Sequence, residues 1–254
     1  MRNVGVLYMK TTNKGSFILE LFNLIPLSRC IINGNSSKCK NVYKLIKKYK
    51  DWIDSSSKKD LPPDFYSDKY KIMMEIMSIN DVEYNDDNRI INEQMKRQHE
   101  LLSNLFGDDY KKEGNDLSII MNYDNNIDSH NMNSYKSSFK RIIEKHKEKI
   151  EIYKNNHKDY ELVFFIFDNA PAYYCEQDGK TLVHVPFNDK YFVEIIKNLN
   201  VDYVVWFTSN KNIWNSKGKY IKLPVAGIYD VINTDDKYID YDAYELKPYK
   251  YEIK

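Results

Sequence analysis

The sequence predicts an α/β fold: a mixed, largely parallel central sheet flanked by helices, with polar insertions. The strongest indication is the segment 160–168, where six consecutive apolar residues predict a strand buried on both faces. Residues 201–208 repeat this composition after a helix-like segment at 189–199, and the order strand, helix, strand is typical of parallel neighbours in one sheet. Amphipathic segments at 41–54 and 134–155 predict helices that cover the sheet.

The N-terminal part of the chain adds smaller elements. Residues 4–9 predict a short edge strand, and Ser16 caps a short helix that carries Glu20 and ends before Pro26. Residues 70–79 predict a strand, although their methionines leave a helix open. The remaining predicted elements are a helix at about 92–106, a short strand at 117–121, a hairpin of 172–175 and 182–185 that turns at Asp178-Gly179, and a strand at 225–232.

These elements predict one domain, 1–254, with an irregular insertion at about 107–133, a basic loop at 209–222 and a C-terminal tail at about 233–254.

Composition limits the classes of function. The formal net charge is +1, from 38 basic and 37 acidic residues, which argues against a generally basic nucleic-acid binder but permits a local basic groove. Cys30, Cys39 and Cys175 are widely spaced, so they fit free thiols in a reducing compartment better than a disulfide framework or a zinc site. No segment has the length and apolarity of a signal peptide or a membrane span, so we expect a cytoplasmic protein.

Two acidic residues are the leading candidates for a functional site. Asp64 follows two prolines, and Glu75 lies in the next apolar strand, with a turn around Ser67-Asp68 between them. Carboxylates on adjacent strands of a hairpin can meet at about 5 Å. Oxygen ligands in this arrangement suit Mg²⁺ or Mn²⁺, which activate water for phosphodiester hydrolysis.

At these residues the chain resembles the restriction-endonuclease-like (PD-(D/E)xK) nuclease superfamily. The family pattern is a helix that carries Glu, a Pro-Asp strand, an acid-x-Lys strand, a helix and a further strand. Pro63-Asp64 matches the Pro-Asp element, and Glu75-Ile76-Met77 matches the acid but has Met77 in place of the lysine. The resemblance implies Asp64 and Glu75 as catalytic metal ligands, with Glu20 as the helix acid. Lys71 is the candidate for a displaced lysine. The whole chain is also similar to uncharacterised proteins of low-GC bacteria and their mobile elements.

Basic residues on two predicted helices are candidates for nucleic-acid contacts. They are Lys44, Lys47 and Lys48 on the first helix and Lys140 and Arg141 on the second, and a solvated charged surface is the alternative explanation. His146 falls on the apolar stripe of the second helix, which predicts a packed core histidine.

Asp168 ends the central strand, at the side of a sheet where ligands bind in open α/β folds. An Asx turn that closes the strand is the favoured alternative, because Asp and Asn often have this role. No glycine-rich phosphate loop or hydrolase triad motif is present.

Three hypotheses remain. The first is a metal-dependent nuclease-like protein that acts on or binds nucleic acid, active or catalytically degenerate. The second is a non-enzymatic protein-binding inhibitor or accessory factor from a phage or mobile element. The third is a small-molecule or nucleotide enzyme that uses Asp168 at the edge of the sheet.

Overall fold

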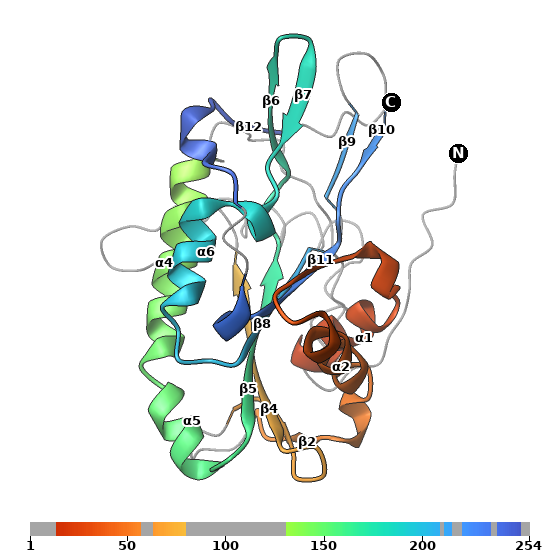
Figure 1. Ribbon diagram of the computed structural model, residues 1–254, viewed down its shortest axis with the longest axis vertical. Coiled ribbons are helices and arrows are strands. Elements are labelled where there is room, and N and C mark those ends of the chain that lie inside the picture. Colours follow the sequence, from red (N-terminus) through yellow and green to blue (C-terminus); the bar gives the residue numbers. More distant parts are fainter. Residues whose placement is uncertain are drawn as a thin grey trace, which may run out of the picture.

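A seven-stranded sheet forms the centre of the computed structural model (Figure 1). The structure describes residues 14–56, 63–79, 131–208, 211–214, 220–234 and 238–249. The strands of this sheet, in spatial order, are β1 (Cys30–Asn33), β11 (Ala226–Asp230), β8 (Tyr203–Phe207), β5 (Glu161–Asp168), β4 (Ile72–Ile79), β3 (Phe65–Ser67) and β2 (Ile53–Asp54).

The sheet is mixed, and its parallel part lies in the middle. Strands β4, β5 and β8 are mutually parallel, and β1 pairs parallel with β11. The pairs β11–β8, β3–β4 and β2–β3 are antiparallel. The predicted α/β class is therefore confirmed, with three parallel and three antiparallel pairs instead of a largely parallel sheet.

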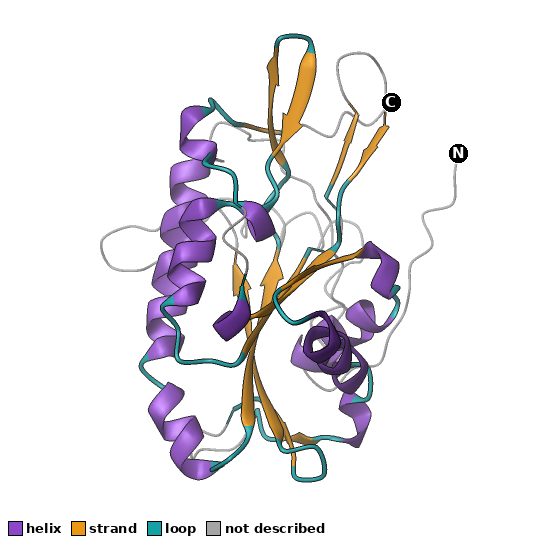
Figure 2. Cartoon of the chain, in the orientation of Figure 1, coloured by secondary structure: helices purple, strands orange, loops and turns teal. Residues whose placement is uncertain are grey.

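Helices cover both faces of this sheet, and Figure 2 shows them as two layers. One layer consists of α4 (Met132–Lys147), α5 (Ile150–Asn156) and α6 (Lys190–Lys197), and the other of α1 (Lys14–Asn23) and α2 (Ser36–Ile46). Successive residues of β5 alternate between the two cores. Leu162 and Phe164 pack under α4–α6, whereas Val163 and Phe165 pack under α1–α2.

Two smaller sheets extend from the main one. The first contains β6 (Tyr173–Gln177), β7 (Lys180–Val183) and β12 (Lys247–Pro248), and the second contains β9 (Asn212–Trp214) and β10 (Tyr220–Lys222). The predicted hairpin over 172–185 is thus confirmed as β6–β7, with its turn at Asp178-Gly179, where both residues have positive φ. The segment 209–222, predicted as a loop, contains the β9–β10 pair.

The two longest predicted helices differ from the observed ones. The helix expected at 41–54 begins at Ser36, because the side chain of Asn35 accepts hydrogen bonds from two backbone amides of the first turn. The helix expected at 134–155 is divided between Lys147 and Ile150 into α4 and α5. Strand β1 was not predicted. The segments predicted at 4–9, 92–106 and 117–121 lie outside the described residues.

Within the described part of the chain, every helix is too short or too polar to cross a bilayer.

Candidate active site

The hairpin β3–β4 brings Asp64 and Glu75 together. Phe65 pairs with Met74, so Asp64, one residue earlier, lies opposite Glu75 on the neighbouring strand. The backbone N–H of Asp64 donates to Glu75 Oε2 at 3.3 Å, and the N–H of Ile76 donates to Asp64 Oδ2 at 2.8 Å. The two carboxylates are therefore held by each other's strand, as their position in a hairpin predicts.

Glu75 points to the face of the sheet that α4 and α5 cover, and these helices supply its partners. His146 Nδ1 lies 2.8 Å from Glu75 Oε1, and Lys149 Nζ lies 3.8 Å from the same oxygen. Lys149 stands in the break between α4 and α5, immediately before α5. We call this group the carboxylate site; its members are Asp64, Glu75, His146 and Lys149.

The carboxylate site is strongly shielded on its acidic side. The Glu75 side chain is 6% exposed, whereas that of Lys149 is 29% exposed, so Lys149 is the more solvent-accessible partner of this ion pair. Burial raises the pKa of Asp64 to about 6, and the charge of Glu75 adds to the rise. Burial, the Glu75 charge and a hydrogen bond to Glu75 likewise raise the pKa of the Tyr153 phenol well above its ordinary value.

The donor set of this site fits a hard divalent cation. Two oxygen donors with mutually repelling charges would be stabilised by Mg²⁺ or Mn²⁺, and Mg²⁺ is commonly held by one or two carboxylates, water and substrate phosphate. Among the described residues, no group of three or more His, Cys, Asp and Glu side chains has the geometry of a metal site. A cation here would therefore depend on Asp64, Glu75 and non-protein ligands.

The raised pKa of Asp64 has a consequence for stability without metal. A free Asp titrates near pH ~3.9, so between about pH 4 and 6 the unfolded chain has lost this proton while the folded chain keeps it. Stability from Asp64 is fully present below about pH 4 and falls as pH rises through about 6. Over this pH interval, the free energy of unfolding of Asp64→Asn should rise relative to that of the wild type by on the order of 1–3 kcal/mol.

Urea unfolding of both proteins in chelator at several pH values measures this difference. The asparagine keeps an oxygen that accepts from Ile76 N–H, so the variant removes only the titration. A stability difference that stays constant with pH would contradict a raised Asp64 pKa.

Two predicted site residues lie elsewhere. Glu20 is on α1, whose core residues Ile18, Leu19 and Phe22 pack on the opposite face of the sheet, and it pairs with Lys50 at 3.1 Å. The Lys71 ammonium donates to the hydroxyl of Tyr160 at 3.2 Å in the β3–β4 turn. The lysine whose ammonium lies near the Glu75 carboxylate is therefore Lys149, whereas Lys71, the predicted candidate, contacts Tyr160.

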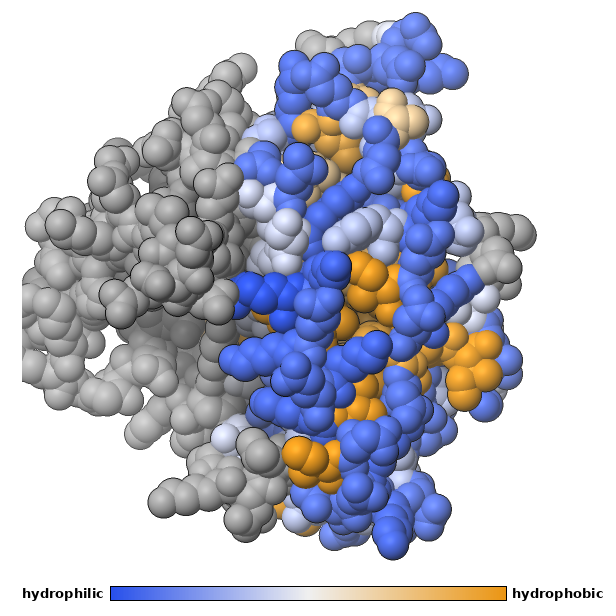
Figure 3. Space-filling view, turned by 90° about the vertical axis from the view of Figure 1, so that its left-hand side faces the viewer, coloured by the Kyte–Doolittle hydropathy of each residue, from blue (hydrophilic) through white to orange (hydrophobic). Residues whose placement is uncertain are grey.

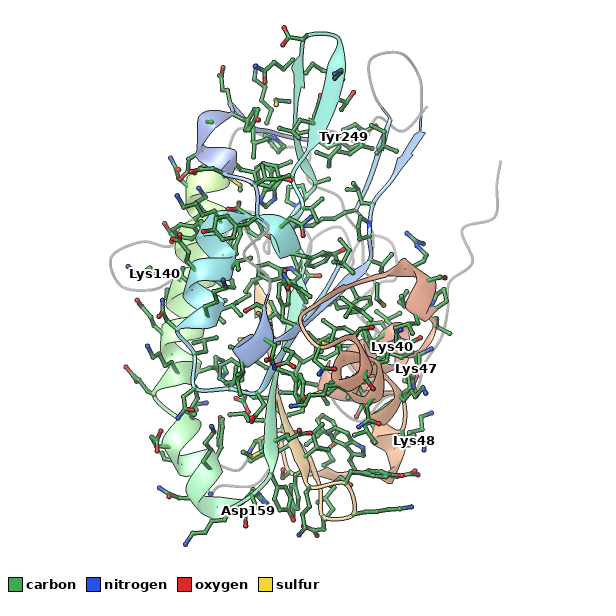
Figure 4. All side chains as sticks on the ribbon, viewed as in Figure 1. Lys40, Lys47, Lys48, Lys140, Asp159 and Tyr249 are labelled. Carbon is green, nitrogen blue, oxygen red and sulfur yellow. The ribbon has the colours of Figure 1, made fainter. Side chains whose placement is uncertain are left out.

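The predicted nucleic-acid contacts also divide into two groups. Lys44, Lys47 and Lys48 belong to the end of α2 and the loop after it, whereas Lys140 and Arg141 belong to α4 in the other layer. Figure 4 shows Lys140 on one side of the molecule and Lys47 and Lys48 on the other. The face that carries α4 is mainly hydrophilic, with hydrophobic residues visible between hydrophilic ones (Figure 3). These five residues do not form one surface.

Sequence reasoning missed both helix residues of the site. His146 was predicted as a core histidine because its position falls on the apolar stripe of α4, yet it contacts Glu75 across 71 residues of chain. Lys149 is one of many lysines in this region and carried no distinguishing signal. A polar residue on an otherwise apolar helix face, opposite a buried carboxylate, is the one available hint for His146.

A second buried polar cluster surrounds Asp168 at the end of β5. Its Oδ2 accepts from the Tyr135 hydroxyl, from Trp206 Nε1 at 3.0 Å and from Lys211 Nζ at 2.7 Å. Its Oδ1 accepts from the Ala170 N–H at 2.9 Å, which is the Asx turn that the sequence offered. Through these four hydrogen bonds Asp168 links β5 to Tyr135 of α4 and Trp206 of β8.

A pocket lies beside this cluster. It is lined by His184, Val185, Pro186, Phe187, Thr208, Lys211, Leu223 and Pro224. Its walls are mainly apolar, and its one ammonium is already paired with Asp168. The pocket therefore gives the third hypothesis, a small-molecule enzyme, little chemistry to use.

Comparisons of the chain with protein-family models, with curated proteins and with solved structures find no match.

Proposed function

We propose that this protein is a metal-dependent nuclease that cleaves phosphodiester bonds with Asp64 and Glu75. The observation that carries the proposal is the juxtaposition of these carboxylates on adjacent strands, with His146 and Lys149 beside Glu75. Paired hard oxygen ligands beside a positive side chain suit the hydrolysis of an anionic phosphodiester.

The order of elements around the site supports the same proposal. The helix with Glu20 is followed, after β1, α2 and β2, by a strand that begins after Pro63-Asp64, a strand with Glu75, the helices α4–α5 and the strand β5. This is the order of the nuclease pattern that the sequence resembles. Glu20 faces the other core, so the proposal gives it no role in the reaction.

Each residue of the site has a distinct chemical task in this proposal. A bound Mg²⁺ or Mn²⁺ would activate water and polarise the phosphate. Asp64 and Glu75 would hold the cation, and Lys149 would neutralise charge that develops on the phosphate oxygens. His146 keeps Glu75 oriented through its Nδ1. Lys149 thus takes the role for which Met77 is unsuited, because Met77 is buried in the core and uncharged.

The first experiment is incubation of single-stranded and duplex DNA and RNA with the wild type in Mg²⁺, Mn²⁺ or chelator. We expect cleavage in either metal and none in chelator. Lys149→Met should lower the rate by about 10²–10³-fold with unchanged fold. The matched control is Lys145→Met, at an exposed position of α4 four residues before Lys149. It should retain wild-type activity.

The outcome separates the first two hypotheses. Full activity of Lys149→Met would contradict its assigned role. A wild type that cleaves no substrate, with a melting temperature indifferent to metal, would favour the inhibitor or accessory factor that binds a protein.

A cytoplasmic location belongs to the same proposal. Cys30, Cys39 and Cys175 are free thiols, as in a reducing compartment. Burial raises the pKa of both Cys30 and Cys39 to about 11, so these two are poor nucleophiles.

A further inference from the structure

The turn between β3 and β4 carries an unusual concentration of lysines against aromatic rings. Lys48 and Lys69 both lie over the ring of Tyr70, at 5.7 and 5.2 Å from its centroid. Lys71 lies over the ring of Tyr160, at 4.7 Å from the centroid. These five residues, called the basic–aromatic tip, come from the loop after α2, the β3–β4 turn and the start of β5.

The tip is built around a constrained backbone. Lys71 has φ +52°, a left-handed conformation that is uncommon for residues other than glycine. Its ammonium donates to the Tyr160 hydroxyl, which in turn donates to Asp68. Lys48, Lys69 and Lys71 are exposed and the two tyrosines are partly buried, so the cations face solvent and part of each tyrosine remains accessible beside them.

A row of rings connects the tip with the carboxylate site. Tyr66 follows Asp64 by two residues on β3, so both side chains lie on the same face of the strand. The ring of Tyr66 lies 4.3 Å from that of His157, and His157 lies 5.1 Å from Tyr160. The turn closes at the Ser67–Ile72 pair, three residues from Asp64, which corresponds to about 10 Å along the strand.

We propose that the basic–aromatic tip binds single-stranded nucleic acid and guides it into the carboxylate site. This inference rests on the proposed nuclease function. Aromatic faces stack on bases that are not paired, and adjacent ammonium groups contact the phosphates between them. In a duplex the bases are stacked inside the helix, so the rings of the tip have nothing to stack on. A span of about 10 Å corresponds to one or two nucleotides of an extended strand, which places a phosphate near Asp64 and Glu75.

The local charge supports this partner. Around the turn and the end of α5, the exposed lysines outnumber the exposed aspartates: they are Lys48, Lys69, Lys71 and Lys158, against Asp68 and Asp159. Asp68 is engaged by the Tyr160 hydroxyl. Figure 4 shows Lys48 and Asp159 at the same end of the molecule, far from Lys140 on α4.

The test is fluorescence anisotropy with a labelled single-stranded oligonucleotide and its duplex, in chelator so that no cleavage occurs. We expect the wild type to bind the single strand more tightly. Lys69→Gln combined with Lys71→Gln should weaken single-strand binding about tenfold or more and lower the salt slope by about 0.7 per lost phosphate contact. Tyr70→Leu should weaken it by about 5-fold or more through lost stacking.

The matched control is Lys145→Gln combined with Lys180→Gln, which removes the same charge at exposed positions of α4 and β7. It should bind like the wild type. An equal loss of single-strand binding in both double variants would contradict the proposed role of the tip. Tighter binding of the duplex, or no binding of the single strand at low salt, would also contradict it. Melting temperatures of all variants verify folding.

The binding assay is independent of the chemistry. If the wild type binds single strands through the tip but cleaves none, the proposed nuclease activity is contradicted and the proposed binding by the tip is retained. If the wild type cleaves and the tip variants still bind the single strand normally, only the proposed role of the tip is contradicted.

Discussion

Asp64→Asn and Glu75→Gln are each expected to lower metal-dependent cleavage by about a thousandfold or more while the protein stays folded. The removed charge is what would hold the cation, and a metal that polarises phosphate and water accounts for several kcal/mol of barrier lowering. Both amides keep an oxygen acceptor, so the hydrogen bonds from Ile76 to residue 64 and from Asp64 to residue 75 can persist. Initial cleavage rates over a range of Mg²⁺ and Mn²⁺ concentrations measure the effect.

The control for these two variants is Glu20→Gln, which removes an acid on the opposite face of the sheet. It should retain wild-type cleavage, although the family pattern would give this residue a metal. Loss of activity in Glu20→Gln equal to that of Asp64→Asn would contradict the placement of the site on the α4–α5 face. Retained activity in Asp64→Asn would contradict the nuclease proposal itself.

Asp168→Leu is expected to destabilise the protein by about 3–5 kcal/mol. Asp168 is 2% exposed and Lys211 is 8% exposed, so the substitution leaves a buried ammonium without its partner. It also removes the acceptor of Tyr135 and of Trp206. Unfolding in denaturant, followed by far-ultraviolet circular dichroism, measures the change in free energy.

A double variant tests the reason for this effect. Lys211→Met in addition to Asp168→Leu removes the unpaired charge, so the double variant should be more stable than Asp168→Leu alone. Lys211→Met by itself should cost less than Asp168→Leu, because Tyr135, Trp206 and the Ala170 N–H still donate to Asp168. A double variant less stable than either single one would contradict the buried-charge explanation.

A further variant, Asp168→Asn, separates the first and third hypotheses. Asp168→Asn should retain its specific cleavage rate wherever it is folded, because Asp168 serves as an anchor and its oxygens face protein donors. Loss of cleavage in a folded Asp168→Asn, with normal rates in Asp64→Asn, would move the active site to the end of β5.

The local part of the architecture follows from the sequence alone. The unbroken apolar run of β5 requires a cover on both faces, and α4–α6 and α1–α2 provide it. The turn at Asp178-Gly179 and the Asx turn at Asp168 depend only on neighbouring residues. Asp64 and Glu75 meet for the same reason, since a short hairpin fixes which residues are opposite.

Only the tertiary structure decided which cations reach those carboxylates. The position of His146 and Lys149 depends on how α4 and α5 lie across the sheet and on the break between them, and neither is encoded in a local pattern. Lys211 reaches Asp168 across 43 residues, and β1 joins the far edge through pairing with β11. Short-range spacing determines strands, turns and the carboxylate pair, whereas packing of distant apolar faces selects the lysine and histidine that surround it.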